Sequence, residues 1–406
     1  MSPAGAPAGT GPRVHRFASL AEVPQEVRDA LTEADSLYVS GPWTEALGRS
    51  NPALPIAFWA VRDATGWLAG TPVHLFDAAP PSPTYDPWSL HPGLVEEPDA
   101  VRALPHALVG TRNGQGNGLL WAPRAAAGGV TAADRAAAVT ALAGAIRAGL
   151  PDHVVAWTYT PPALARTLAA ALPGAAVLLA DTTAELVLPA AAGGGPPDFL
   201  GSVRASARRR LRADRAAIDG AGGLGTPERD PAAVAGLSEE LAPLLGAVMA
   251  RHGHTPDVPA LARYLRACAA PGLHPAVFTV READGRPVAF SLCVRHGEEM
   301  SVRVVGLDHT AVHARDAMDY AHVAVHGPLA LAARTGVRRI DLGVGTLDAK
   351  LLRGARLRPL ATVVSPPPAG GHRPLPGREL ARLPLLVEQS RVLAARRPED
   401  WNDLED

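Results

Sequence analysis

The chain contains little cysteine and little lysine. Its 406 residues include two cysteines, Cys268 and Cys293, which excludes a disulfide framework at this length and fits a reducing compartment. Their spacing is unlike that of metal-binding cysteines, so we expect two buried free thiols and no metal site. The composition favours alanine, glycine, proline and arginine over lysine, a bias that reflects the genome more than the function.

The sequence also lacks long apolar runs and an excess of charge. No run of about 18 apolar residues is free of charges or helix breakers, so we expect no membrane-spanning helix. The first 13 residues have no apolar segment of the kind found in a signal peptide. The formal net charge is -1, which provides no global basic field for nucleic acid. We therefore expect a cytoplasmic protein that binds no DNA and contacts RNA, if at all, through a local patch.

Composition divides the chain into two α/β halves. Residues 1–13 are rich in proline and glycine and predict a disordered leader. Residues 191–197 (AAGGGPP) predict a linker. We expect an N-terminal domain over 14–190, a C-terminal domain over 198–365, and a Pro/Gly loop with a closing helix over 366–406.

The first half contains a hairpin followed by alternating helices and strands. Residues 56–61 and 67–76 read as two strands joined by a turn. Thr131 and Asp134 have the spacing of a capping box and predict the start of a helix over 131–150. The other predicted elements are helices at 20–34 and 161–172 and strands at 118–121, 153–159, 176–180 and 183–188.

The second half opens with an arginine-rich helix that begins after Asp198. Its apolar stripe has helical spacing and comprises Leu200, Val203, Ala207, Leu211 and Ile218. Its other faces carry Arg204, Arg208, Arg209, Arg212 and Arg215. These arginines are either a solvated face or a surface that binds phosphates, because guanidinium groups bind phosphate in a fork.

A meander and a long helix follow. Helices are predicted at 231–251 and 258–270, and antiparallel strands at 275–281, 287–295 and 300–307. A helix over 316–335 then ends at a glycine, and strands follow at 338–342 and 360–364.

The stretch from Arg338 to Arg358 is the strongest candidate for a site. A short strand leads into a turn at Gly343 and Gly345, and a short helix then carries Lys350 and Arg353. We expect these two cations at the mouth of a sheet, where they suit a phosphate or a developing oxyanion. The alternative is an ordinary strand–helix turn with cations facing solvent.

Three segments of the second half together resemble a known family. They are FLGSVRASARRRLRADRAAI, the meander AVFTVREADGRPVAFSLCVRHGEEMSVRVVGLD with the helix and strand after it, and VGTLDAKLLRGARLRPL. They are similar to GNAT-fold acyltransferases, specifically the Fem-type, peptidoglycan-biosynthesis-like transferases with two tandem GNAT-like domains. The resemblance covers about 199–364 well and the first half only in its order of elements.

The resemblance implies an α/β fold of two tandem GNAT-like domains, with mixed, largely antiparallel sheets flanked by helices. It implies transfer of an aminoacyl group from aminoacyl-tRNA, or of an acyl group, onto a small-molecule or peptide amine, without a tightly bound cofactor. Lys350 would stabilise the tetrahedral intermediate. The donor-binding residues would be Arg353, Gly343, Gly345, Arg204, Arg208 and Arg212.

Two departures from the family pattern bear on the donor. Ala349 stands where Fem-type proteins often have phenylalanine. Residues 308–315 (DHTAVHAR) do not have the glycine spacing of a pyrophosphate loop, which lowers the expectation of acetyl-CoA as donor. Two alternatives to an aminoacyl-tRNA-dependent transferase remain. One is an acyl-CoA-dependent N-acyltransferase, and the other is a catalytically silent GNAT-like binding module.

Candidates for proton transfer and for the acceptor site come from the residue types. Proton transfer needs a group that titrates or donates within reach of the amine, and the candidates are Asp308, His309, His313, Tyr320 and His322. Trp43, Tyr85 and Trp88 are candidate walls of the acceptor site. For each residue the alternative is plain packing or a surface position.

Overall fold

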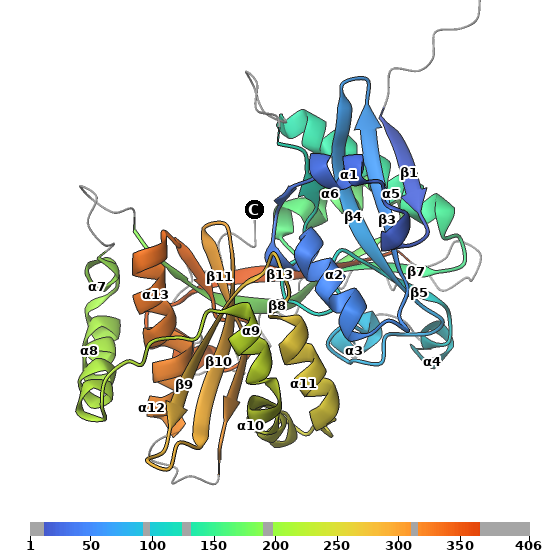
Figure 1. The fold of residues 1–406 in the computed structure, drawn as a ribbon. Helices are drawn as coiled ribbons and strands as arrows, with labels where there is room; N and C mark the ends of the chain where they lie inside the picture. The colour runs from blue at the N-terminus through green and yellow to red at the C-terminus, as the bar shows by residue number, and fades with distance from the viewer. Residues whose placement is uncertain (1–11, 92–97, 124–130, 190–197, 310–315, 366–406) are drawn as a thin grey trace, which may run out of the picture. The chain divides into compact units, whose positions relative to one another are not determined.

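The computed structural model describes residues 12–91, 98–123, 131–189, 198–309 and 316–365. The chain divides into two compact units (Figure 1). Unit 1 comprises Met1–Thr44, Pro52–Ala180 and Leu360–Leu380, and unit 2 comprises Glu45–Asn51, Asp181–Pro359 and Ala381–Asp406. The chain therefore passes from unit 1 to unit 2 and returns near its end. The predicted linker 191–197, the segment 366–406 and most of the predicted leader lie outside the described residues.

Unit 1 is built on a mixed sheet. Its strands follow the order β1 (Arg13–Phe17), β3 (Ile56–Asp63), β4 (Gly66–Phe76), β5 (His106–Val109), β7 (Val154–Thr160) and β13 (Arg356–Ser365). All neighbours are antiparallel except β5 and β7, which are parallel. The short strands β2 (Glu33–Ala34) and β6 (Leu120–Trp121) pair with each other, and β6 also pairs with β4.

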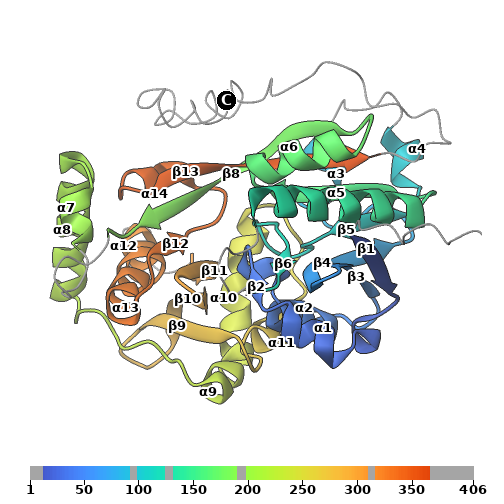
Figure 2. The same ribbon diagram turned by 90° about the horizontal axis from the view of Figure 1, so that it is seen from above.

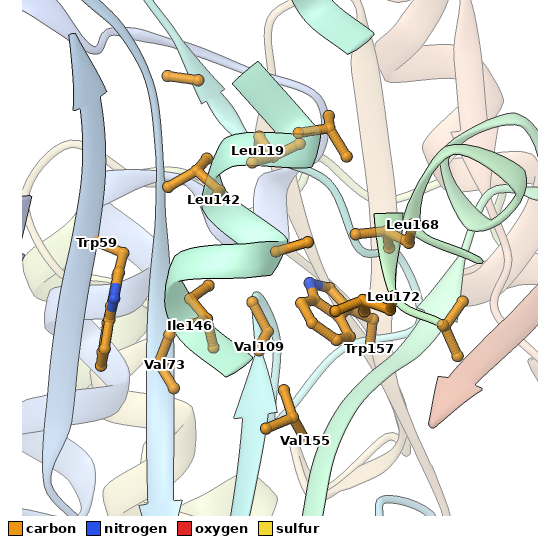
Figure 3. Close-up of a cluster of buried hydrophobic side chains, with 14 of the residues drawn as sticks. Trp59, Val73, Val109, Leu119, Leu142, Ile146, Val155, Trp157, Leu168 and Leu172 are labelled. Atoms are coloured by element: carbon orange, nitrogen blue, oxygen red, sulfur yellow. The ribbon is translucent and has the colours of Figure 1, made fainter. Parts of the chain in front are cut away.

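Two helices cover one face of this sheet and form the core of unit 1. They are α5 (Ala132–Gly149) and α6 (Pro162–Ala171), which lie side by side (Figure 2). Figure 3 shows Leu142 and Ile146 of α5 in one cluster with Trp59, Val109 and Trp157 of the strands. The remaining helical segments are η1 (Leu20–Glu22), α1 (Gln25–Ala30), η2 (Leu37–Val39), α2 (Gly41–Ser50), α3 (Pro87–Leu90) and α4 (Pro98–Arg102).

The N-terminus of α5 is fixed by the predicted capping box. The side chain of Thr131 accepts a hydrogen bond from the main-chain N–H of Asp134 (3.1 Å), and the Asp134 carboxylate accepts one from the N–H of Thr131 (3.1 Å). Two N–H groups that the helix leaves unpaired are thereby satisfied.

Replacing Thr131 by alanine is expected to lower the free energy of unfolding by about 1 kcal/mol, the usual cost of a lost N-cap. Urea denaturation of the full chain measures it. Thr167→Ala is the matched control because Thr167 lies inside α6 and bonds only the carbonyl of Ala163. That control should change stability by less than about 0.5 kcal/mol, and equal effects in the two variants would argue against the cap.

Unit 2 contains the remaining strands, in a mixed arrangement with helices on both faces. Its strands follow the order β8 (Ala176–Val187), β12 (Arg339–Asp341), β11 (Glu299–Leu307), β10 (Pro287–His296) and β9 (His274–Arg281). Only β11 and β12 are parallel among these pairs. The helical elements on one face are α8 (Ala205–Gly220), α12 (Asp316–Ala321), the π-helical turn His322–His326 and α13 (Gly327–Thr335) (Figures 1 and 2). The helices on the other face are α9 (Pro231–Gly236), α10 (Ser238–Arg251) and α11 (Val258–Ala267). The short helices are α7 (Phe199–Ser202) and α14 (Leu347–Leu351).

The two units repeat one order of elements. Each has an antiparallel hairpin, a third antiparallel strand, a helical segment and a strand parallel to the third. In each unit the parallel pairing covers three residues, His106–Leu108 with Val154–Ala156 and Glu299–Ser301 with Arg339–Asp341. The predicted α/β fold with two tandem domains and mixed, largely antiparallel sheets is confirmed.

Several predicted elements differ in detail from the structure. The helix predicted over 20–34 is η1, α1 and β2, and the two strands predicted over 176–188 are the single strand β8. The helix predicted to start after Asp198 breaks at Val203 and Arg204, which leaves Leu200 exposed. The helix predicted over 316–335 contains the π turn His322–His326, because Pro328 has no N–H to donate to the preceding turn.

Both cysteines are buried free thiols, as predicted. Within the described ranges no helix is both long and apolar enough to cross a membrane.

Candidate functional site

The candidate site lies in unit 2, where β11 and β12 part. Their parallel pairing ends at Ser301 and Asp341. β12 stops there, while β11 continues to Leu307 with β10 as its partner on the other edge. One edge of β11 beyond Ser301 thus has no strand beside it in the described part of the chain. Such an edge presents main-chain N–H and C=O groups that an extended ligand can pair with.

An irregularity in β11 accompanies this parting. Leu292 of β10 faces Val304 and the next residue, Cys293, faces Val302, so Arg303 is an extra residue in β11. A bulge of this kind bends its strand and often stands beside an active site. The Arg303 guanidinium lies 5.5 Å from the centre of the Tyr264 ring.

The turn after β12 is held by Lys350 from within. The Lys350 ammonium donates to the main-chain oxygens of Gly343 (2.7 Å) and Val344 (3.0 Å), and the residue is 3% exposed. Burial lowers the pKa of Lys350 to about 8, although Asp341 and Asp181 act to raise it. The sequence led us to expect a cation presented at the mouth of the sheet; the structure places it inside, bonded to the glycine turn.

Asp341 holds the other side of the same turn. Its carboxylate accepts hydrogen bonds from the hydroxyl of Thr183 (2.5 Å) and the N–H of Gly343 (2.9 Å). Gly343 and Gly345 have φ of 72° and 70°, values that glycine adopts without strain. Thr346 also has a positive φ, 48°, so the approach to α14 is a tightly constrained turn.

Arg353 is likewise buried, at 3% exposure, and two of its three guanidinium nitrogens are hydrogen-bonded within the protein. Its Nε donates to the carboxylate of Asp214 at 2.8 Å and one of its amino groups donates to the carbonyl of Ala349 at 2.9 Å. Asp214 on α8 also pairs with Arg210 (3.0 Å) and lies 4.0 Å from Nε2 of His326. Arg353 therefore joins α8 to α14 and lies in the interior of unit 2, whereas we expected it at the mouth of the sheet.

The arginines of α8 fall into two groups. Arg204 and Arg208 are half-buried and donate to the carbonyls of Leu351 and Val203. Arg212 is exposed, as is Arg209. The basic surface of α8 is thus smaller than its sequence suggests, because the guanidinium groups of Arg204 and Arg208 donate hydrogen bonds to main-chain carbonyls of the protein.

The candidates for proton transfer lie at the end of β11 and on α12. Asp308 pairs with Arg286 at 2.5 Å. His309 accepts a hydrogen bond at Nδ1 from Arg251 (2.8 Å), because a guanidinium can only donate. Burial raises the pKa of Tyr320 to about 12, with Arg353 acting to lower it, so the phenol is protonated near neutrality. Burial also lowers the pKa of His322, and His313 lies outside the described residues.

The three aromatic candidates for the acceptor site belong to unit 1 and are buried. Trp43 packs edge-on against Tyr38, and Tyr85 packs edge-on against Tyr159. The indole N–H of Trp88 donates to His106 at 2.8 Å. These contacts are those of core packing, the alternative that the sequence had left open.

Unit 1 has a corresponding parting of parallel strands, but a side chain of the same unit bridges it. Beyond the last pair of β5 and β7, the amide of Asn117 donates to the carbonyls of Val109 (2.7 Å) and Thr158 (3.1 Å). The main-chain N–H of Asn117 donates to the carbonyl of Tyr159 (2.9 Å). The opening between the strands is therefore filled in unit 1.

Sequence reasoning missed Asp214 and Thr183. Asp214 follows Arg210 by four residues and looks like half of a surface pair, whereas its main partner lies 139 residues away. A stronger signal went unused: Lys350 is the only lysine of the chain. Among the described residues no group of three or more histidine, cysteine or acidic side chains could hold a metal.

Comparison with known proteins supports the fold assigned here. Residues 204–351 match the family model described as an acetyltransferase (GNAT) domain. The crystal structure of FemX matches over 84% of this chain and 95% of its own, with 11% identity and a TM-score of 0.54. A tandem GNAT protein from the clavulanic acid biosynthesis pathway matches over 87% and 98%, with 12% identity and a TM-score of 0.44. No curated protein matches the sequence.

At these identities the likeness to FemX concerns the fold. Together with the family match over residues 204–351, it confirms the predicted GNAT-like fold.

Proposed function

We propose, from the premise that residues 204–351 form a GNAT domain in a chain with the fold of FemX, that this protein is an N-acyltransferase. It would move an acyl or aminoacyl group from an activated ester or thioester onto an amine. The observation that carries the proposal is the parting of β11 and β12 after Ser301 and Asp341, beside the turn that Lys350 holds.

The donor would bind in unit 2 along the open edge of β11. An acyl donor that contains amide groups can pair with this edge as an additional strand would. The equivalent opening in unit 1 is bridged by Asn117, so we place one donor site in the chain and none in unit 1.

The reaction needs positioned groups and little else. The amine nitrogen attacks the carbonyl carbon, the tetrahedral intermediate collapses, and the ester oxygen or thioester sulfur leaves with a proton. Tyr320 would supply that proton, because its phenol stays protonated. Asp308 and His309 at the end of β11 would take up the proton of the amine, directly or through water.

Lys350 and Arg353 would act mainly by position. Lys350 fixes Gly343 and Val344, and Arg353 fixes α14 through Ala349, so together they shape the mouth of the opening. Gly343 and Gly345 would let the donor approach the main chain closely. A donor phosphate would meet the exposed Arg212, with Arg204 and Arg208 holding the start of α8.

The donor class follows the Fem-type resemblance, so our first candidate is aminoacyl-tRNA. Its contact surface would be the exposed side of α8. The second candidate is acyl-CoA, which the open edge of β11 favours because the arm of CoA contains two amide groups. The acceptor would be a small molecule or peptide with a primary amine. Trp43, Tyr85 and Trp88 would support its site from within unit 1, since they are buried.

Donor binding tests the proposal. The full chain is titrated with a mixed aminoacyl-tRNA pool and with a panel of acyl-CoAs at low and moderate salt. Saturable binding of an aminoacyl-tRNA should weaken with salt, and Arg209→Gln/Arg212→Gln should lower the slope of log K against log salt by about 2. The matched control is Arg263→Gln/Arg266→Gln, two exposed arginines of α11.

Binding of acyl-CoA alone, unchanged in the α8 variant, would select the second candidate. If neither donor bound, the catalytic proposal would fail and the chain would be a GNAT-like module that binds another ligand.

A further inference from the structure

We propose a second ligand site in unit 2, a cavity of about 170 Å³ that takes a small carboxylate with an apolar body. It lies among the start of β9, the end of β10, the start of β11 and the C-terminal end of α13. Met300 lines it, whereas the opening between β11 and β12 begins beyond Ser301. The cavity therefore lies at the start of β11 and the opening lies farther along the same strand, so they are two separate sites.

The inner wall of the cavity is apolar and neutral. Leu273, Ala276, Met300 and Leu331 line it and are buried. The thiol of Cys293 belongs to the same wall, and burial raises its pKa to about 12, so it carries no charge at neutral pH. Such a wall favours an aliphatic or aromatic group over water.

The outer wall is basic. It includes Arg229, His274 and Arg295, of which the first two are exposed and the third half-buried. Within the described residues Arg229 and His274 have no carboxylate partner. Arg295 uses its Nε to donate to the carbonyl of Gly297 (3.1 Å), which leaves its two terminal amino groups for a ligand.

No acidic residue lines the cavity. Three acids are adjacent in sequence to lining residues, and each has other partners: Glu299 pairs with Arg339 at 3.1 Å, and Glu228 and Asp230 are hydrogen-bonded in the turn before α9. Glu228 accepts hydrogen bonds from the N–H groups of Arg229 and Asp230, and Asp230 accepts one from the N–H of Ala233. Two guanidinium groups beside a neutral, apolar wall therefore select a ligand with one anionic end, and a carboxylate matches the fork of arginine.

The volume limits the ligand to a small molecule. One buried water needs about 10–15 Å³ of such space, so the cavity of about 170 Å³ holds roughly 11–17 waters and suits a ligand of the size of benzoate. Nucleotides and CoA are too large for it.

Titration of the full chain with benzoate tests the site, with binding followed by calorimetry. Arg229→Gln and Arg295→Gln should each weaken benzoate binding about tenfold, since each removes one charge-assisted contact. Arg334→Gln is the matched control because Arg334 is an exposed arginine of the last turn of α13 that does not line the cavity. It should bind benzoate like the parent protein. Benzyl alcohol, neutral and of similar size, should bind at least tenfold more weakly than benzoate.

Three results would overturn the proposal. The first is benzoate binding that is unchanged in the Arg229→Gln/Arg295→Gln pair, and the second is an equal loss in Arg334→Gln. The third is no saturable binding of benzoate below about 10 mM, a free energy weaker than about 3 kcal/mol. Inorganic phosphate that binds as tightly as benzoate would refute the role of the apolar wall. Circular dichroism of each variant verifies that it is folded.

Discussion

Asp214→Ala is expected to lower the free energy of unfolding by about 3–5 kcal/mol, the cost of leaving a buried charge without its partner. Asp214 is 6% exposed and bonds Arg353, which is 3% exposed, at 2.8 Å. Without the carboxylate, the Arg353 guanidinium would stay in the interior with only the carbonyl of Ala349 and no counter-charge. Urea denaturation of the full chain measures the loss.

The same helix provides the control. Asp219 pairs with Arg215 at 2.8 Å, four residues apart as Asp214 and Arg210 are, but its side chain is 51% exposed. Asp219→Ala should therefore cost no more than about 0.5 kcal/mol. If the two variants lost the same stability, Asp214 would be an ordinary surface acid and the link between α8 and α14 would not exist.

A double variant separates charge from packing. In Asp214→Leu/Arg353→Met both buried charges are absent, and replacing a buried ion pair by apolar side chains is often neutral. We expect this variant to recover most of the stability lost in Asp214→Ala. Donor affinity should stay reduced in it, because Arg353 no longer holds the carbonyl of Ala349.

Lys350 is expected to titrate near pH 8, well below the ordinary value of 10.5, because its ammonium is buried. Since the chain has no other lysine, one side-chain resonance in a sample labelled with isotopic lysine reports this titration without assignment. A midpoint near 10.5 would mean that the ammonium is exposed to water, contrary to its hydrogen bonds with Gly343 and Val344.

The lowered pKa predicts a rise of stability with pH. Between about pH 8 and 10.5 the folded protein has released the proton of Lys350 while the unfolded chain still holds it. Unfolding then takes up a proton, so the free energy of unfolding increases with pH in this window, by about 3 kcal/mol in total. Below pH 8 both states are charged and the penalty of burying the ammonium is fully present.

Lys350→Met isolates this effect from other groups that titrate in the same range. The difference in stability between the parent protein and the variant should shift in favour of the parent as pH rises from 7 to 10. A pH-independent difference would exclude the lowered pKa. We also expect a large loss of donor affinity in the variant, because two carbonyls of the turn lose their donor.

The fold was largely predictable because its helices and strands have clear local periodicity. The hairpin β3–β4, the meander β9–β10–β11 and the capped helix α5 follow directly from alternation and from the Thr131–Asp134 pair. The elements that were missed are short or mixed in polarity. β5 has four residues, and β1, with the sequence RVHRF, is largely exposed.

The geometry of the candidate site was not predictable from the sequence. The sequence indicated the segment around Gly343 and Lys350, because a strand, a glycine turn and a cation follow one another. It placed Lys350 and Arg353 at the mouth of the sheet, because the short helix that carries them follows a strand and a glycine turn, and nothing in that order shows that both side chains are buried. The buried Arg353 guanidinium is paired with the carboxylate of Asp214 on α8, and that contact between distant parts of the sequence exists only in the folded chain.

The return of the chain to unit 1 has a consequence for its synthesis. The last segment of β13 pairs with β7, and Ala361 and Val363 complete the core of unit 1. On a ribosome that adds roughly 5–20 residues per second, residues 181–359 emerge before this strand does. One side of β7 therefore stays unpaired for about ten to forty seconds, although unit 1 contains the first residues to be synthesised. Among the described residues, those that complete the unit begun first are synthesised last, and an exposed strand edge during that interval is where a chaperone or a misfolded pairing would act.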